Sequence, residues 1–212
     1  MNFLKSEYSQ EKLTFKQSYS KLFWILLIGT IFIPVAVHFL GLYIYKSNPE
    51  SVTKVSAYIQ AAMSGIGDIS NDSNSMVMLK IFANNARVSL RFVMFGSIPL
   101  IYFPMFAYLT NMALIGLVTS LVVNLSGASV IGILAGLIPH GIFEIPAIVY
   151  ATVLGVVLCK EMTKALWGKE HKPFNELFYN AARGYCLVVV PLLMIAGFVE
   201  SFITPIIMNL FA

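Results

Sequence analysis

Charged residues are scarce in this chain of 212 residues: Asp, Glu, Lys and Arg make up 11% of it, and 58% is hydrophobic. An ordinary soluble domain contains about 25% charged residues. Between Phe92 and Cys159 there is no Lys, Arg or Asp, and the stretch contains one carboxylate, Glu144, and one histidine, His140. As an α-helix at ~1.5 Å per residue, that stretch would measure about 100 Å, roughly three times the hydrocarbon core of a bilayer. The sequence therefore predicts a chain that crosses a membrane several times.

Catalytic and cofactor motifs are also missing from the sequence. The two cysteines, Cys159 and Cys186, are too few for a disulfide framework and lack the spacing of a metal site. There is no HExxH zinc pair, no GxSxG nucleophile motif and no phosphate-binding loop. The net charge of +4 comes largely from lysines beside apolar runs, which membrane orientation explains. We therefore expect no enzymatic activity, no metal, no cofactor and no nucleic-acid partner.

The apolar runs predict an all-α fold, a polytopic membrane bundle of five transmembrane helices with short extra amphipathic helices. The predicted spans are residues 22–45, 84–103, 105–125, 131–158 and 184–207. Pro99, Pro104 and Asn111 divide the second span from the third. Residues 22–212 are expected to form a single membrane domain, preceded by a cytoplasmic segment at residues 1–21.

The charges of the connecting segments predict an orientation. The amino-terminal segment contains four Lys residues and the 160–183 loop contains five Lys and Arg residues, against two in residues 46–75. Because cytoplasmic segments are enriched in Lys and Arg, the amino terminus and the 160–183 loop are expected in the cytoplasm. Five spans then place the 46–79 loop and the carboxyl terminus outside the cell membrane. Lys80, Arg87 and Arg91 break this pattern locally.

The outer loop contains its own helical pattern. Val52, Val55, Ile59 and Met63 fall at helical spacing. Two interpretations are open for this short amphipathic helix. It lies on the membrane surface, or it packs over the outer face of the domain.

Several polar groups are expected inside the membrane. Lys80, Asn84, Arg87 and Arg91 follow one another at intervals of four, three and four residues, which places them on one side of a helix. A charge at the bilayer centre costs ~3 kcal/mol on the insertion scale, so cations and carboxylates should pair. We predict an ion-paired cluster of Arg91, Glu144 and Glu200, completed by four polar neighbours: Asn84, Asn85, Arg87 and His140. Such a cluster either specifies how the helices assemble or forms an ion path, a proton relay or a substrate cavity.

Small residues at helical spacing predict where helices pack closely. The third span offers Gly116 and Ser120, and the fourth offers a longer stripe: Gly132, Gly136, Ala147, Ala151 and Gly155. Small side chains let helix backbones approach each other within a membrane. These faces should therefore contact neighbouring helices and not lipid.

The block Pro139-His140-Gly141-Ile142-Phe143-Glu144-Ile145-Pro146-Ala147 resembles the stage II sporulation protein M family of bacterial and archaeal membrane proteins. Further matching positions lie outside this block: Asn84-Asn85, Asn111, Val190-Pro191, Glu200 and Thr204-Pro205. The resemblance covers residues 84–205. It implies a five-span helical protein without a known catalytic centre.

The resemblance also implies two functions. The protein that names the family is a membrane scaffold that recruits two peptidoglycan-degrading enzymes during engulfment, so the first hypothesis is a scaffold or complex subunit. Other members are encoded beside transporter ATPases or within the gene sets of circular bacteriocins. The second hypothesis is therefore a component for export, maturation or immunity, with a polar intramembrane cavity. Expected partners are membrane lipids and other membrane proteins, a peptidoglycan hydrolase or a transporter ATPase complex, and homo-oligomers are left open.

Overall fold

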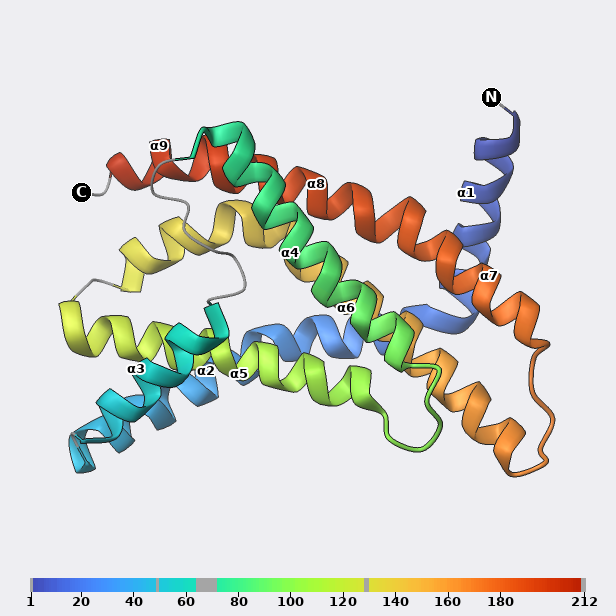
Figure 1. Cartoon of the computed structure of the whole chain (residues 1–212), viewed down its shortest axis with the longest axis horizontal. Helices are drawn as coiled ribbons and strands as arrows, with labels where there is room; N and C mark the ends of the chain where they lie inside the picture. The colour runs from blue at the N-terminus through green and yellow to red at the C-terminus, as the bar shows by residue number, and fades with distance from the viewer. Residues whose placement is uncertain (1, 49, 64–71, 128–129, 211–212) are drawn as a thin grey trace. The chain divides into compact units, whose positions relative to one another are not determined.

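The computed structural model describes residues 2–48, 50–63, 72–127 and 130–210, and these residues form helices without any strand (Figure 1). The α-helices are α1 Asn2–Thr14, α2 Ser20–Ser47, α3 Glu50–Met63, α4 Asn74–Phe95, α5 Phe103–Ser126, α6 Val130–Leu166, α7 Phe174–Gly184, α8 Val190–Phe198 and α9 Thr204–Asn209. Three π-helical turns join consecutive helices: Phe15–Tyr19, Tyr185–Val189 and Val199–Ile203. The all-α prediction is confirmed.

Within the described residues, four helical stretches are long and apolar enough to cross a membrane: Phe3–Ser47, Phe103–Leu125, Ile131–Leu166 and Phe174–Asn209. The protein is thus a multi-pass membrane protein, for which the predicted count of five spans is approximate. The span predicted at 84–103 differs from the structure, because α4 begins at Asn74 and ends at Phe95. The chain then turns, and Leu100 and Tyr102 adopt positive φ angles of 71° and 46°. Pro99 and Pro104 cannot donate the backbone hydrogen bonds that would continue the helix through this turn.

The described residues group into two compact units. The first combines described residues from segments 1–28, 85–108 and 144–194, and the second combines those from 29–84, 109–143 and 195–212. Each unit therefore draws on distant parts of the sequence. The prediction of one membrane domain from residue 22 onward stays a prediction.

The first unit has its core along α6. Ala147 and Ala151 have no exposed surface. One turn further on, Gly155 meets the backbone of Phe92, and a Cβ atom on Gly155 would lie 2.7 Å from Cγ of Pro104. Only a residue without a side chain allows the end of α4 and the start of α5 to approach α6 this closely.

In the second unit, small residues bring α2 and α5 together. A Cβ atom on Gly116 of α5 would lie 2.5 Å from the carbonyl oxygen of Pro34 in α2. Ser120, one turn along α5, is fully buried beside Gly41 of α2. Close approach of the two backbones is the arrangement that small residues favour in membrane helices.

The helix predicted in the outer loop corresponds to α3. Its residues Val52 and Val55 pack against Tyr45 and Leu121 in a hydrophobic cluster of the second unit. Ile59 and Met63 lie outside the residues whose side chains the structure describes. The observed contacts favour packing over the domain, the second of the two interpretations.

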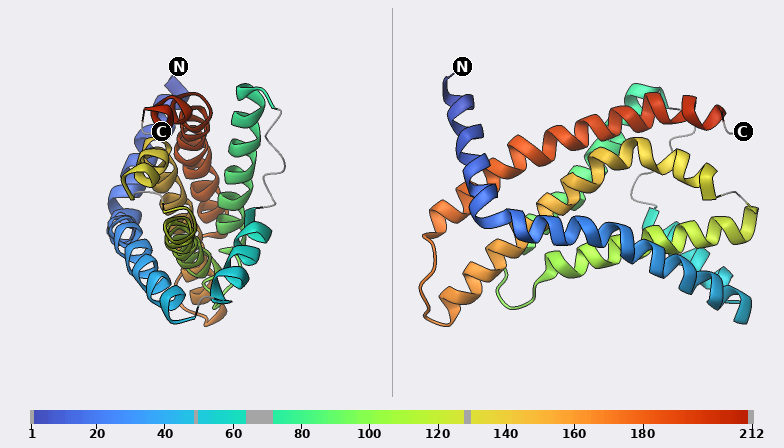
Figure 2. Two further views of the ribbon diagram at one scale, coloured as in Figure 1. Left: turned by 90° about the vertical axis from the view of Figure 1, so that its left-hand side faces the viewer. Right: turned by 180° about the vertical axis from the view of Figure 1, so that it is seen from behind.

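The amino-terminal segment is helical and belongs to the first unit. Its helix α1 turns away from α2 at the π-helical turn Phe15–Tyr19 (Figure 2) and contacts α7. A π-helical turn disturbs the regular hydrogen-bond ladder and is a recognised cause of such bends. Residues 2–21 are therefore integrated into the helical structure.

Candidate functional site

A buried group of charged side chains connects α1, α6 and α7 in the first unit. Nε of Arg183 donates to Oε2 of Glu11 over 2.8 Å, and these two side chains are only 7% and 4% exposed. Nη2 of Arg183 donates to Oγ1 of Thr14 over 2.9 Å. The hydroxyl of Tyr150, from α6, donates to Oε1 of Glu11. We call Glu7, Glu11, Thr14, Tyr150 and Arg183 the Glu11–Arg183 cluster.

The remaining contacts of this cluster reinforce the position of the guanidinium. Nη1 of Arg183 lies 3.9 Å from Oε2 of Glu7, and its Cζ lies 5.7 Å from the centroid of the Tyr179 ring. Two carboxylates and an aromatic face therefore surround one cation. A Cβ atom on Gly184 would come within 2.7 Å of Oε1 of Glu11, so α1 approaches the end of α7 closely.

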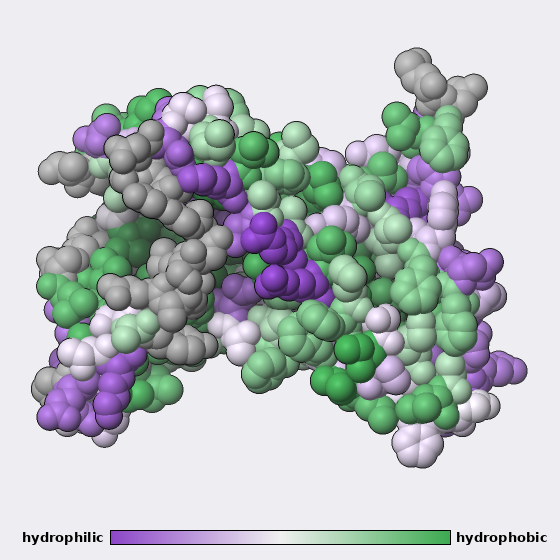
Figure 3. Space-filling model, viewed as in Figure 1, coloured by the Kyte–Doolittle hydropathy of each residue, from purple (hydrophilic) through white to green (hydrophobic). Residues whose placement is uncertain are grey.

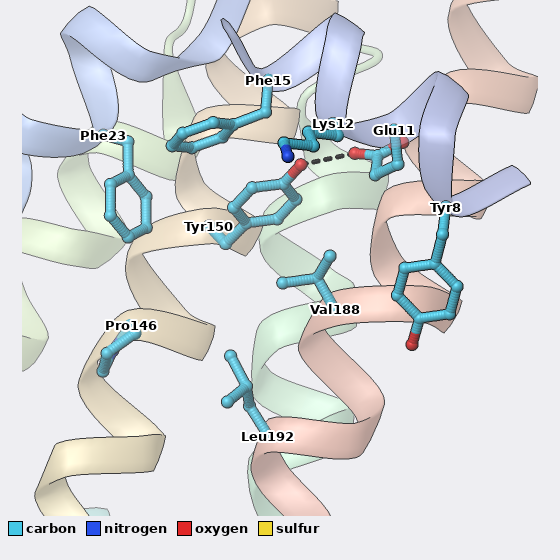
Figure 4. A pocket seen from close by; sticks show the side chains of 9 residues that line it. All are labelled: Tyr8, Glu11, Lys12, Phe15, Phe23, Pro146, Tyr150, Val188 and Leu192. Carbon is cyan, nitrogen blue, oxygen red and sulfur yellow. Dashed lines mark hydrogen bonds between the residues drawn. The ribbon is translucent and has the colours of Figure 1, made fainter. Parts of the chain in front are cut away.

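Two pockets adjoin the Glu11–Arg183 cluster within the first unit. One, of about 300 Å³, is mainly apolar and includes Phe15, Phe23, Pro146 and Leu192 in its lining (Figure 4). The other, of about 520 Å³, lies between α1 and α7 and is lined by polar side chains that include Gln10, Glu176 and Asn180. Residues of the Glu11–Arg183 cluster therefore line both the apolar pocket and the polar pocket.

A second polar pair lies in the second unit. A ring nitrogen of His140 and a carboxylate oxygen of Glu200 lie within 4.8 Å of each other, and both residues are partly buried. Glu200 belongs to the π-helical turn Val199–Ile203, and π-helical turns are frequent at functional sites. An imidazole beside a carboxylate has the chemistry to relay a proton or to bind a metal ion.

The other predicted cluster residues have different surroundings. Glu144 follows His140 by one turn of α6 and is partly buried, and both asparagines of α4, Asn84 and Asn85, are also partly buried. All three take part in interactions within the chain. Lys80 forms an ion pair with Asp72, in which Nζ lies 2.5 Å from Oδ2.

The arginines of α4 lie on its exposed side. Arg87 and Arg91 are exposed, whereas Ser89, Phe92 and Val93 are buried on the opposite side of the helix. Figure 3 shows hydrophilic side chains along the middle of α4, flanked by hydrophobic ones. The helix thus turns these arginines away from its buried face, and the expected pairing of Arg91 with Glu144 and Glu200 stays a prediction.

The predicted packing residues occupy both units. Gly116 and Ser120 lie against α2, and a Cβ atom on Gly136 would lie 3.1 Å from Sδ of Met208 in the second unit. Gly132 is partly buried and interacts with other residues. The remaining members of the stripe, Ala147, Ala151 and Gly155, lie in the core of the first unit.

Sequence reasoning did not identify the Glu11–Arg183 cluster. Glu7, Glu11 and Thr14 are spaced four and three residues apart, so they lie on one side of α1. This spacing is the one feature of the sequence that indicates a polar contact of α1. It does not identify the partner, because Arg183 is 172 positions away from Glu11. Only the folded arrangement of α1 and α7 brings the two together.

Comparison with known proteins identifies the family. The family model described as stage II sporulation protein M matches residues 22–205. An uncharacterised protein of Methanocaldococcus jannaschii is 37% identical over 73 residues, which are 34% of this chain and 41% of that protein. The chain thus covers less than half the length of this relative, and no solved structure gives a significant match. The region that the family model matches includes α5, α6 and four polar residues, Asn84, His140, Glu144 and Glu200. The chain therefore belongs to the stage II sporulation protein M family.

Proposed function

We propose that the protein is a non-enzymatic membrane scaffold or complex subunit that assembles with other membrane proteins. The observation that carries this proposal is the Glu11–Arg183 cluster. Its central charges are almost fully buried and bond to each other, which suits a group that fixes helices in place. A catalytic or transport group must instead reach water or a substrate. Membership of the stage II sporulation protein M family supports the same function.

The partner surface that we propose is formed by α7 and the turn before it. Phe174 and Phe178 are spaced one helical turn apart and are 46% and 47% exposed, and nearby Trp167 is 67% exposed. Exposed aromatic residues are enriched at protein interfaces and at membrane surfaces. With the amino terminus in the cytoplasm, α7 lies at the cytoplasmic end of the bundle. A transporter ATPase could contact this surface directly, whereas a peptidoglycan hydrolase would need a cytoplasmic segment of its own.

Copurification in a mild detergent tests the proposal. We expect the wild-type protein to retain a stoichiometric membrane-protein partner, and Phe178→Ala to lose most of it while inserting normally. Phe39→Ala is a matched control, because Phe39 is also exposed, at 65%, but lies on α2. A wild-type protein that purifies alone, or a Phe178→Ala variant that keeps its partner in full, would contradict this assignment.

The second candidate is a component of an export, maturation or immunity system that works with a transporter ATPase. It is favoured by the partly buried His140 and Glu200 pair. In this function, Glu200→Gln and Glu144→Gln should insert at normal levels, keep their partners and fail in substrate flux. In a scaffold, the same substitutions should lower protein level and partner recovery together.

A further inference from the structure

The apolar pocket beside the Glu11–Arg183 cluster has the form of a ligand site. Its volume of about 300 Å³ is at the lower end of the ~300–1,000 Å³ range of small-molecule sites. The rings of Phe15 and Phe23 lie 5.9 Å and 6.1 Å from that of Tyr150. Figure 4 shows Val188 and Leu192 facing Tyr150 and Pro146 across the cavity. The interior therefore suits an alkyl chain.

The rim of this pocket is positively charged. Lys12 lines it and is exposed. Lys5 is exposed as well, and its spacing of seven residues from Lys12 places both on nearly the same side of α1. Lys16, in the π-helical turn that follows, is also exposed. The carboxylate of Glu11 is held by Arg183 and Tyr150, so Lys12 at the rim is available to an anion.

We propose that this pocket binds an anionic phospholipid, with part of one acyl chain between Phe23, Tyr150 and Leu192 and the phosphate beside Lys12. This proposal needs only that the protein resides in a membrane, and it is independent of the scaffold function. The exposed Trp24 and Ile28 of α2, both at 55%, follow the pocket residue Phe23 and provide an apolar approach from the bilayer.

The physical reason for selectivity lies in the headgroup. An acyl chain in the bilayer is already in an apolar solvent, so the pocket gains packing contacts but little hydrophobic free energy. A Lys near an anionic membrane surface contributes ~1 kcal/mol, equivalent to about a fivefold change in affinity. Lys12 should therefore control which lipid is held, and the apolar wall should control whether a lipid is held at all.

Native mass spectrometry of the delipidated full chain, titrated separately with phosphatidylglycerol and phosphatidylcholine, tests this proposal. We expect one tightly bound phosphatidylglycerol and a clear preference for it over phosphatidylcholine. Lys12→Gln should reduce that preference about fivefold. Lys21→Gln is the matched control, because Lys21 is exposed but does not line the pocket.

Filling the cavity provides the second arm of the experiment. Leu192→Trp should abolish the tight binding of both lipids. If this variant loses its helical circular dichroism or its monodisperse elution, Val188→Phe replaces it in the experiment. The proposal is overturned if the two lipids bind equally to the wild type, or if both filled variants retain the lipid. Crosslinking from position 12 to a copurified polypeptide in place of lipid would also overturn it.

Discussion

At the residue scale, the arrangement of α1 depends on one guanidinium. Arg183 contacts Glu7, Glu11 and Thr14, all on one side of α1. An uncompensated buried charge is far more costly than an exposed one. The Glu11–Arg183 cluster therefore holds the amino-terminal helix against α7 only while both signs of charge are present.

Removing that guanidinium should strongly destabilise the protein. Arg183→Ala leaves the carboxylate of Glu11 buried beside Tyr150, and breaking a buried pair in this way costs about 3–5 kcal/mol. Unfolding followed by circular dichroism in detergent measures the change. Lys172→Ala is the control, because the Lys172–Glu176 pair is half exposed and its N–O distance is 3.9 Å. A surface pair of this kind contributes under ~1 kcal/mol, so equal losses in the two variants would refute the prediction.

Residue spacing had limited power to predict these sites. The intervals between Lys80, Asn84, Arg87 and Arg91 correctly describe one side of a helix, but they do not say which side is buried. The buried residues Ser89, Phe92 and Val93 decide that, and they leave Arg87 and Arg91 outside. Similarly, the sequence does not identify Arg183 as the partner of Glu7 and Glu11, because only the folded structure brings α1 and α7 together.

At the scale of elements, apolar runs predicted α2, α5 and α6 well, because long hydrophobic helices are a strong sequence signal. The prediction was less accurate for α4, whose span was placed at 84–103. Its helix starts earlier, in the polar sequence from Asn74, and ends at Phe95. The turn before α5 contains Ile98, Leu100 and Ile101 and no charged residue, so hydropathy alone extended the predicted span across it.

The close contact of α6 with the end of α4 and the start of α5 leads to a prediction about helix packing. Gly155→Ala should destabilise the protein by ~1–3 kcal/mol, since the added methyl group would meet the backbone of Phe92 and the ring of Pro104. Gly136→Ala is a matched substitution on the same helix. Its methyl group would meet the flexible end of Met208 at 3.1 Å and should cost much less. Thermal unfolding of both variants checks the difference, and a more stable Gly155→Ala variant would argue against close packing here.

At the scale of the whole molecule, the number of membrane crossings decides on which side of the membrane the carboxyl terminus lies. In the part of the chain that the structure describes, four stretches satisfy the length and hydropathy of a membrane helix, and α4 is the candidate for a fifth crossing. Its 22 residues would rise ~33 Å, enough for a ~30 Å hydrocarbon core. Its basic residues oppose insertion by ~3 kcal/mol each at the bilayer centre, and less near the surface.

We predict that α4 does cross, with the amino terminus in the cytoplasm and the carboxyl terminus outside. The ion pair of Lys80 with Asp72 lies near the start of α4, where the cost of a charge is smallest, so Arg87 and Arg91 carry most of the penalty. Fusions of green fluorescent protein and of alkaline phosphatase to the carboxyl terminus distinguish the topologies, because the first fluoresces in the cytoplasm and the second is active outside. The same two fusions at the amino terminus are the control and should give the opposite result. If both termini report the cytoplasm, the chain crosses an even number of times, and α4 lies along the membrane with its arginines in contact with water or lipid headgroups.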